Sequence, residues 1–139
     1  MEGFRFKHPI EVRYGDLDPQ GHLNNAKHFT YIEQARVNYI RHLDLWDGES
    51  FLDLGFILAN AQITYRKPIR LGDPVLVGVR VTRLGNKSLT MEYAIENDET
   101  CELYASASTV QVAFDYHNKR TVPIPGDWRT MIIEYEGLI

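Results

Sequence analysis

The chain has 139 residues, of which 44% are hydrophobic and 24% are charged, and its formal net charge at pH 7 is -4. This length and apolar content suit one globular domain, expected over residues 1–139, and leave no room for a second. The 15 Lys and Arg residues are spread along the chain and never form a run longer than two, so the chain lacks the basic stripe that binding to a phosphate backbone requires, and nucleic acid is not expected as a partner.

Cysteine content and the N-terminal residues indicate a cellular compartment. Cys101 is the only cysteine, which rules out an internal disulfide and suits a reducing environment. The N-terminus, MEGFRFKHPIEV, alternates polar and apolar side chains and lacks the apolar core of a signal peptide. The sequence also lacks a long apolar span. We therefore expect a cytoplasmic protein without a membrane partner.

Alternation of polar and apolar residues predicts that most of the chain is β-strand. The period of two occurs in five segments, at residues 4–14, 57–65, 75–81, 89–95 and 102–116. Short turn signals separate them, for example LGNKS, which begins at Leu84, and ENDET, which begins at Glu96. Such short connections favour antiparallel neighbours in a meander.

Two segments follow the helical period instead. Between residues 26 and 45, apolar side chains recur at steps of three and four, over about five turns. One long helix among strands predicts an α+β fold, in which one curved antiparallel sheet of about five strands wraps around the helix and buries it on most sides. A shorter helix is expected at residues 128–135, with Asp127 as its N-cap.

A polar loop joins the first strand to the N-terminus of the long helix. The first turn of a helix has unpaired N–H groups and the positive end of the helix dipole, so it can hold an anion or a developing oxyanion. Asn24 or Asn25 is expected to cap this helix. Asp18 would lie close enough to attack, or to activate water against, a carbonyl whose oxygen points at those amides. Acyl transfer is the chemistry that suits this arrangement.

The segment GDLDPQGHLNNAKHFTYIEQAR, residues 15–36, resembles the signature of the hotdog-fold acyl-CoA thioesterases, particularly the 4-hydroxybenzoyl-CoA thioesterase-like family. DPQG resembles the catalytic loop of that family, whereas GHLNNAKH is closer to the long-chain acyl-CoA and plant acyl-carrier-protein branches. ITYRKPIRLGDPVLV and LGNKSLTMEYAI resemble the second and third strand regions, so the similarity covers most of the chain. The resemblance implies a hotdog fold and hydrolysis of acyl-CoA to free acid and CoA. No cofactor is expected, since CoA is part of the substrate.

The resemblance also implies roles for individual residues. Asp18 matches the catalytic carboxylate, a nucleophile or general base, and the backbone N–H of Asn25 matches the group that polarises the thioester carbonyl. His22 matches a residue implicated in catalysis in the plant-like branch, although Gln20 stands where that branch has Asn.

Contacts with the substrate are expected at three further residues. Asn24 lies beside the catalytic residues, and Phe29 lies on the apolar helix face that would form the acyl slot. Lys87 matches a basic position where some relatives hold the nucleotide phosphates of CoA. The benzoyl-type branch has aromatic and proline residues in place of NNAK, so a benzoyl-type substrate is not implied.

Several of these residues have a structural alternative. Asp16, beside a glycine after a strand, is typical of a turn former, and His22 could be a packed residue with one ring N–H on a carbonyl. Some relatives place the acid on the long helix, which makes Glu33 the reserve candidate, although Glu33 could simply pair with Arg36. Asp16, Asp18 and His22 alone would be a weak metal site, and no metal is expected.

Two classes of function remain. The leading one is an acyl-CoA thioesterase, and the alternative is a catalytically silent module that binds acyl-CoA or an acyl carrier protein. Because a single sheet leaves an uncovered edge strand, a homodimer or homotetramer is expected. The resemblance implies the same, with sheets joined edge to edge and active sites between subunits.

Overall fold

The computed structural model describes residues 1–138, with Phe51 described by its backbone only, so Ile139 of the expected domain lies outside the described residues. The first half contains β1 (Phe6–Ile10), the 3-10 turn η1 (Tyr14–Asp16), α1 (Asn25–His42) and a second 3-10 turn, η2 (Phe51–Asp53). The second half contains β2 (Phe56–Tyr65), β3 (Val75–Leu84), β4 (Ser88–Asn97), β5 (Leu103–Asp115), β6 (Arg120–Thr121) and α2 (Gly126–Glu136). The predicted α+β class is confirmed.

The strands form one antiparallel sheet in the order β1-β3-β4-β5-β2, and the short β6 pairs with the end of β5. Strands β3, β4 and β5 form the expected meander. Strand β2 does not join it at β3, because its partner is β5. The segment 66–74 therefore crosses from β2, at one edge of the sheet, to β3, which lies next to the other edge strand β1. The prediction of a meander throughout is wrong for β2.

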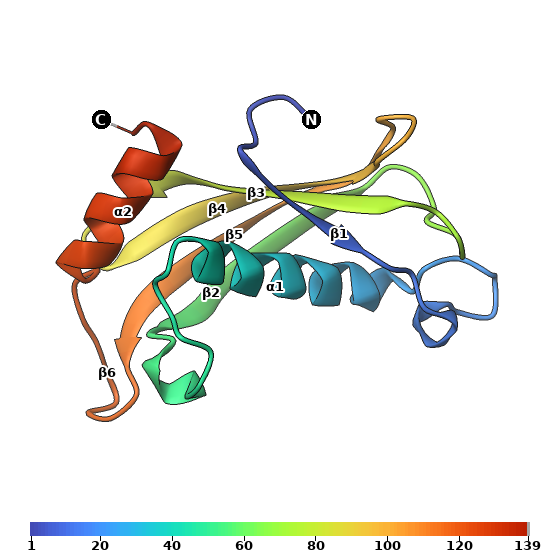
Figure 1. Ribbon diagram of the computed structural model, residues 1–139. Helices are drawn as coiled ribbons and strands as arrows, with labels where there is room; N and C mark the ends of the chain where they lie inside the picture. The colour runs from blue at the N-terminus through green and yellow to red at the C-terminus, as the bar shows by residue number, and fades with distance from the viewer. Residues whose placement is uncertain (139) are drawn as a thin grey trace.

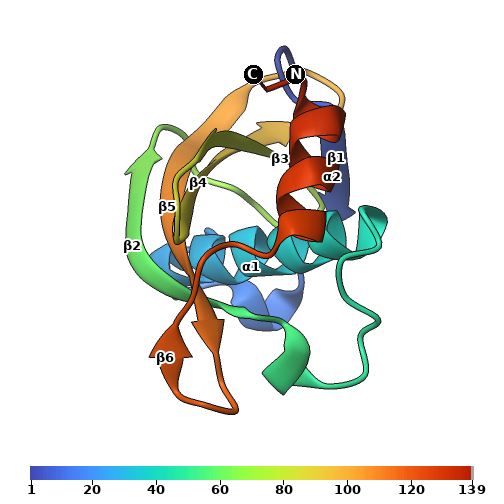
Figure 2. The same ribbon diagram turned by 90° about the vertical axis from the view of Figure 1, so that its left-hand side faces the viewer.

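Helix α1 lies across the concave face of the sheet (Figures 1 and 2). The residues that it buries there recur at helical spacing: His28, Tyr31, Ile32, Ala35, Tyr39 and Ile40. The opposite side, which carries Gln34 and Arg41, is exposed. The predicted curved sheet over a long helix is confirmed, but in a single chain the sheet covers the helix on one side only. The helix ends at His42, before the expected residue 45, because Asp44 adopts a left-handed φ of 56°.

Strand β1 is shorter than the predicted strand 4–14. Its pairing with β3 ends where Ile10 lies opposite Val75, the first residue of β3. Beyond that pair β3 offers no further residue to hold the chain in the sheet. Tyr14, expected on the apolar face, is 83% exposed and begins η1. The chain thus leaves the sheet just before the polar loop.

Helix α2 packs at the end of the sheet where β3 finishes (Figure 1). Trp128 and Ile132 are its buried residues. Glu136 attaches it to the core, because its Oε2 accepts hydrogen bonds from Tyr39 Oη at 2.7 Å and from Val81 N at 2.8 Å. The expected helix is confirmed, but Asp127 lies inside its first turn and is not the N-cap.

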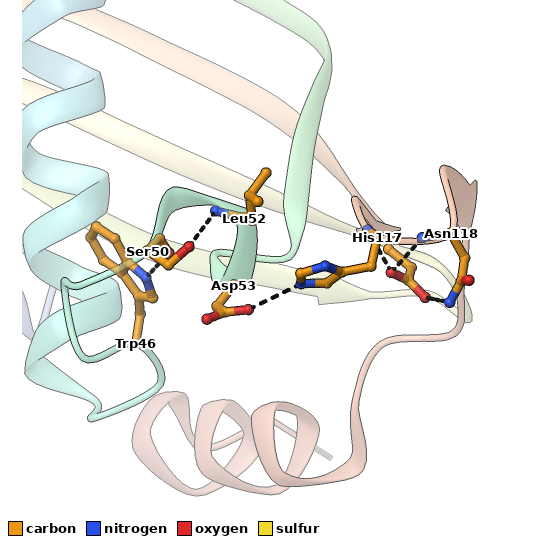
Figure 3. Close-up of polar contacts among 7 residues, drawn as sticks. Trp46, Ser50, Leu52, Asp53, His117 and Asn118 are labelled. Atoms are coloured by element: carbon orange, nitrogen blue, oxygen red, sulfur yellow. Dashed lines mark hydrogen bonds and ion pairs between the residues drawn. The ribbon is translucent and has the colours of Figure 1, made fainter.

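Polar contacts hold the segment between α1 and β2 (Figure 3). Trp46 Nε1 donates to the carbonyl oxygen of Ser50 at 2.8 Å, and Leu52 N donates to Ser50 Oγ at 3.3 Å. Asp53 Oδ1 lies 3.4 Å from Nε2 of His117, which belongs to the turn after β5. These contacts tie the start of β2 to the end of β5.

Candidate active site

The loop between η1 and α1 is closed by its own backbone. Asp18 N donates to the carbonyl oxygen of His22 at 2.9 Å, and Gly21 N donates to that of Asp18 at 3.0 Å. Gly21 has a φ of 83°, a conformation that favours glycine. Leu23 N also donates to the carbonyl oxygen of Ile69 at 2.7 Å, which ties the loop to the crossover segment. The polar side chains of the loop are thus carried on a fixed backbone.

The N-terminus of α1 is capped by Asn24. Its Oδ1 accepts a hydrogen bond from Ala26 N at 2.9 Å, which makes Asn25 the first residue of the helix. No group among the described residues accepts a hydrogen bond from the N–H of Asn25. An unpaired donor at the positive end of a helix dipole is a suitable partner for an oxyanion. The side-chain oxygen of Asn24 is thus occupied by capping. The expected contact of Asn24 with the substrate stays a prediction.

Asp18 is half-buried and holds its carboxylate in an Asx turn, since its Oδ1 accepts from Gln20 N at 2.9 Å. No hydrogen bond to its Oδ2 occurs within residues 1–138. His22 is also half-buried, and the described residues offer its ring no hydrogen-bond partner. The carboxylate of Asp18 therefore has one oxygen fixed and one available.

A hollow of about 290 Å³ brings these residues together. Asp18, His22 and Asn25, the three predicted catalytic residues, all contribute to its lining. Tyr65, at the end of β2, closes the opposite side and donates from its hydroxyl to the carbonyl oxygen of Asn25 at 2.9 Å. A carboxylate and a helix N-terminus therefore face one common space, as acyl transfer requires.

Sequence reasoning missed four residues with polar or charged side chains that line this hollow: His28, Tyr65, Arg66 and Lys67. His28 is buried and lies edge-on to the ring of Tyr65, with centroids 4.8 Å apart. Burial lowers the pKa of His28 and outweighs the hydrogen bonds to the carbonyls of Asn24 and Asn25, so its ring is neutral near pH 7. The signal for the two cations was the pair RK directly after β2, but only the crossover of segment 66–74 places this pair beside the loop.

A second hollow of about 260 Å³ follows the first along the seam between α1 and β2. It is lined by Phe29, Ile32, Glu33, Arg36, Leu58, Ala61 and Thr109. Phe29 lies in this lining, and its contact with an acyl chain stays a prediction. Glu33, the reserve acid, lies in this second hollow and is exposed. The expected ion pair between Glu33 and Arg36 does not form among the described residues.

Lys87 lies at the other end of the molecule from the loop. It follows β3, whose first residue pairs with Ile10 near the loop and whose ten residues run away from it. At about 3.3 Å per residue, the length of β3 separates Lys87 from the Asp18 hollow. Within one chain the structure does not bring Lys87 to this hollow, and its predicted contact with CoA would need a second copy.

Asp16 has a structural role, as its turn-forming interpretation predicted. It is buried, its Oδ2 accepts from Tyr31 Oη at 2.8 Å and from Arg13 N at 3.2 Å, and its Oδ1 contacts the Arg13 guanidinium at 3.4 Å. Burial opposes ionisation, but these hydrogen bonds and the charge of Arg13 outweigh it, so the pKa of Asp16 lies below its ordinary value. The carboxylate anchors the loop entrance to α1.

We expect Asp16→Asn to destabilise the fold by about 1–3 kcal/mol, because an amide NH₂ cannot accept the bonds that a carboxylate oxygen accepts. Since the folded-state pKa is depressed, the stabilisation is present above the unfolded pKa near 4 and is lost as pH falls through the folded value. Denaturant unfolding from pH 7 to pH 2 measures this. The difference in the free energy of unfolding between the wild type and Asp16→Asn should shrink as the pH falls. A difference that is constant with pH would contradict the depressed pKa of Asp16.

The donor sets of the chain give little support for a metal. Within residues 1–138 no group of three or more His, Cys, Asp and Glu side chains is placed to hold an ion. Asp16, the first residue of the weak set considered from the sequence, is engaged with Tyr31 and Arg13.

Comparisons with known proteins identify the family of the chain. The model of the thioesterase-like superfamily matches residues 12–132. A thioesterase from Thermus thermophilus, solved as a complex with coenzyme A and Zn, has a TM-score of 0.85 and 38% identity, covering 99% of this chain and 98% of its own. The long-chain acyl-CoA thioesterase FadM of Escherichia coli is 26% identical over 120 residues, 86% of this chain and 91% of FadM. The 1,4-dihydroxy-2-naphthoyl-CoA hydrolase of Synechocystis is 25% identical over 133 residues, 94% of this chain and 96% of that protein.

The comparisons and the topology together confirm the predicted hotdog fold and the predicted enzyme class, a thioester hydrolase. None of the helices within residues 1–138 is long and apolar enough to cross a membrane. The chain belongs to the thioesterase-like superfamily, whose family model spans it from the residues just before the Asp18 loop to the last helix.

Proposed function

We propose that this protein hydrolyses acyl-CoA thioesters at the hollow that Asp18, His22 and Asn25 line. The observation that carries the proposal is the shared space between the carboxylate of Asp18 and the unpaired N–H of Asn25 at the N-terminus of α1. The named activities of the relatives, on long-chain acyl-CoA and on 1,4-dihydroxy-2-naphthoyl-CoA, support CoA thioesters as the substrate class.

In the proposed reaction the thioester carbonyl oxygen accepts a hydrogen bond from the N–H of Asn25, where the helix dipole favours the negative charge that develops on it. Asp18 either attacks the carbonyl carbon or takes a proton from the attacking water. The C–S bond breaks, the CoA thiolate leaves and takes up a proton, and water supplies the oxygen of the free acid. His22 lies on the same hollow and is placed to move a proton. No cofactor takes part.

The two ends of the substrate would leave the hollow in different directions. The acyl group would enter the second hollow between α1 and β2, where Phe29, Ile32 and Leu58 provide apolar walls. The CoA phosphates would lie near Arg66, which is exposed and has no carboxylate partner among the described residues. Lys67 is beside it, although its Nζ pairs with Glu102 at 2.7 Å.

A thiol-release assay on a series of straight-chain acyl-CoAs tests the activity and the slot together. We expect kcat/KM to rise from acetyl-CoA to decanoyl-CoA, because each buried methylene contributes about 0.8 kcal/mol. If the protein binds the acyl-CoAs but releases CoA from none of them, the catalytically silent binding module is favoured. Equal turnover of acetyl-CoA and decanoyl-CoA would contradict the apolar slot and leave the thioesterase assignment standing.

We also propose that β2 is a subunit interface. Its ten residues, FILANAQITY, form one edge of the sheet and contain no charge and no proline. Soluble proteins usually place charged residues or prolines on a free edge strand, so a long edge strand without them is typical of one that pairs with another chain. Leu58 and Tyr65 on this strand are 50% and 43% exposed. The other edge, β1, contains Pro9, which cannot donate to a neighbouring strand.

Light scattering at micromolar concentration should therefore give the mass of a dimer or a tetramer. Ala59→Lys places a charge at the exposed middle of β2 and should shift the mass toward the monomer. Thr82→Lys, at an exposed residue of the internal strand β3, is the matched control. A monomeric wild type would contradict both the interface and a site shared between subunits.

A further inference from the structure

A polar cluster lies at the inner end of the second hollow. Arg36 Nη1 donates to Tyr93 Oη at 3.3 Å, Tyr93 Oη and Thr109 Oγ1 are hydrogen-bonded at 2.7 Å, and Gln111 Nε2 donates to Thr109 Oγ1 at 3.3 Å. Tyr93, Thr109 and Gln111 are at most 5% exposed. The hydrogen bonds between these groups offset the cost of burying them and fix the Tyr93 hydroxyl against the Arg36 guanidinium.

Arg36 gives this cluster a positive charge that no carboxylate of the described residues pairs with. Arg36 is half-buried, and no carboxylate lies within ion-pair distance of its guanidinium in residues 1–138. Glu33, which lines the same hollow, does not pair with it. The contact with Tyr93 uses one of the five N–H groups of the guanidinium, which leaves donors for a ligand.

Arg36 lies at the right distance from the reacting centre to meet the end of a tail. From Asn25 to Arg36 the helix advances by about 16 Å, and an arginine side chain on a helix leans back toward the N-terminus. Strand β2 runs alongside in the opposite direction, so Tyr65 lies at the Asn25 end, whereas Leu58 lies on the hollow with Arg36. A tail of medium length that begins at the thioester carbonyl would end beside the guanidinium.

We propose that this hollow takes acyl groups that end in a carboxylate, and that Arg36 binds that carboxylate. This inference rests on the proposed thioesterase activity and names its substrate class. The planar guanidinium can donate two parallel hydrogen bonds to the two oxygens, which a terminal methyl group cannot accept. Phe29, Ile32, Leu58 and Ala61 contact the methylenes between the two polar ends.

The experiment compares two CoA thioesters of equal length, decanoyl-CoA and the mono-CoA thioester of decanedioic acid. In the wild type, kcat/KM for the decanedioyl thioester should equal or exceed that for decanoyl-CoA. In Arg36→Met, which keeps an unbranched apolar stem, the ratio of decanedioyl to decanoyl kcat/KM should fall about tenfold or more, because hydrogen bonds between charged groups are lost. Arg41→Met, on the exposed side of the same helix, should leave the ratio unchanged.

Each outcome decides a separate point. If the wild type releases CoA from neither thioester, the proposed function fails. If it prefers decanoyl-CoA tenfold, or if Arg36→Met leaves the ratio unchanged, the carboxylate site is wrong and the thioesterase assignment stands. The wild-type comparison alone decides the matter should Arg36→Met fail to fold, because an unpaired carboxylate in an apolar slot would be strongly rejected.

Discussion

Replacing Asp18 with Asn should lower kcat at least a hundredfold and change KM little. The substitution keeps the shape of the side chain and the oxygen that accepts from Gln20 N, but it removes the basic, nucleophilic carboxylate. General-base assistance alone is worth roughly 100- to 10,000-fold, and the loss of a nucleophile can cost more. A fall confined to kcat marks a group that acts in the transition state.

The melting temperature distinguishes this role from a structural one. Asp18 is half-buried and has no ion-pair partner within residues 1–138, so the Asn variant should melt at the wild-type temperature or slightly above it. Asp16→Asn is the matched control, since that acid is buried and hydrogen-bonded and its loss should lower stability.

Glu33→Gln tests the reserve acid. The carboxylate of Glu33 lies on the second hollow, eight residues beyond Asn25 and thus about 12 Å further along the helix. We expect this variant to retain turnover within a few-fold of the wild type. Near-normal kcat in Asp18→Asn together with loss of activity in Glu33→Gln would move the catalytic acid from the loop to the helix.

Replacing Asn25 with Pro should lower kcat by about 100- to 1,000-fold with little loss of stability, because it deletes the N–H proposed to bind the oxyanion. Asn25 is the first residue of α1, the position at which a helix accepts proline most readily. The preceding residue, Asn24, has φ -59° and ψ 135°, which is the conformation that a residue before proline prefers. The variant therefore removes a single N–H from the hollow while the helix start is retained.

Asn25→Ala separates the peptide from the side chain. It keeps the N–H and removes only the exposed amide group, so we expect kcat close to that of the wild type. Circular dichroism and thermal melting of both variants check that α1 is intact. Full activity in Asn25→Pro would place the oxyanion site elsewhere, and a fall of similar size in both variants would mean that the side chain acts in the reaction.

The sequence was sufficient for features that depend on neighbours along the chain. The long helix follows from its apolar spacing, and Asp18, His22 and Asn25 belong to one short segment that ends at the helix N-terminus. Local hydrogen bonds close this segment, such as the one from Asp18 N to the carbonyl oxygen of His22, so proximity in sequence became proximity in space. The family motif lies in the same segment, which is why the fold and the site could be predicted together.

Only the tertiary structure decided which faces of β2 and β5 point inward, whereas the alternation in β3 and β4 predicted their buried residues correctly. The apolar residues Val110 and Val112 predicted β5, but Thr109 and Gln111 of the opposite parity are the ones buried. In β2 an irregularity between Leu58 and Asn60 shifts the register, so the simple alternation expected from the sequence does not hold along the strand. Polar groups were thereby placed beneath α1, where no apolar pattern could have revealed them.

Pairing between distant segments decided the rest of the site. Because β2 pairs with β5 and the chain then crosses to β3, Tyr65 and Arg66 lie beside the Asp18 loop, whereas Lys87 lies at the far end of β3. The sheet order depends on which strands bury their apolar faces against α1 and on hydrogen bonds between residues far apart in sequence. Residue types and spacing alone therefore predicted that Asp18, His22 and Asn25 lie together, and long-range strand pairing determined the walls of their hollow.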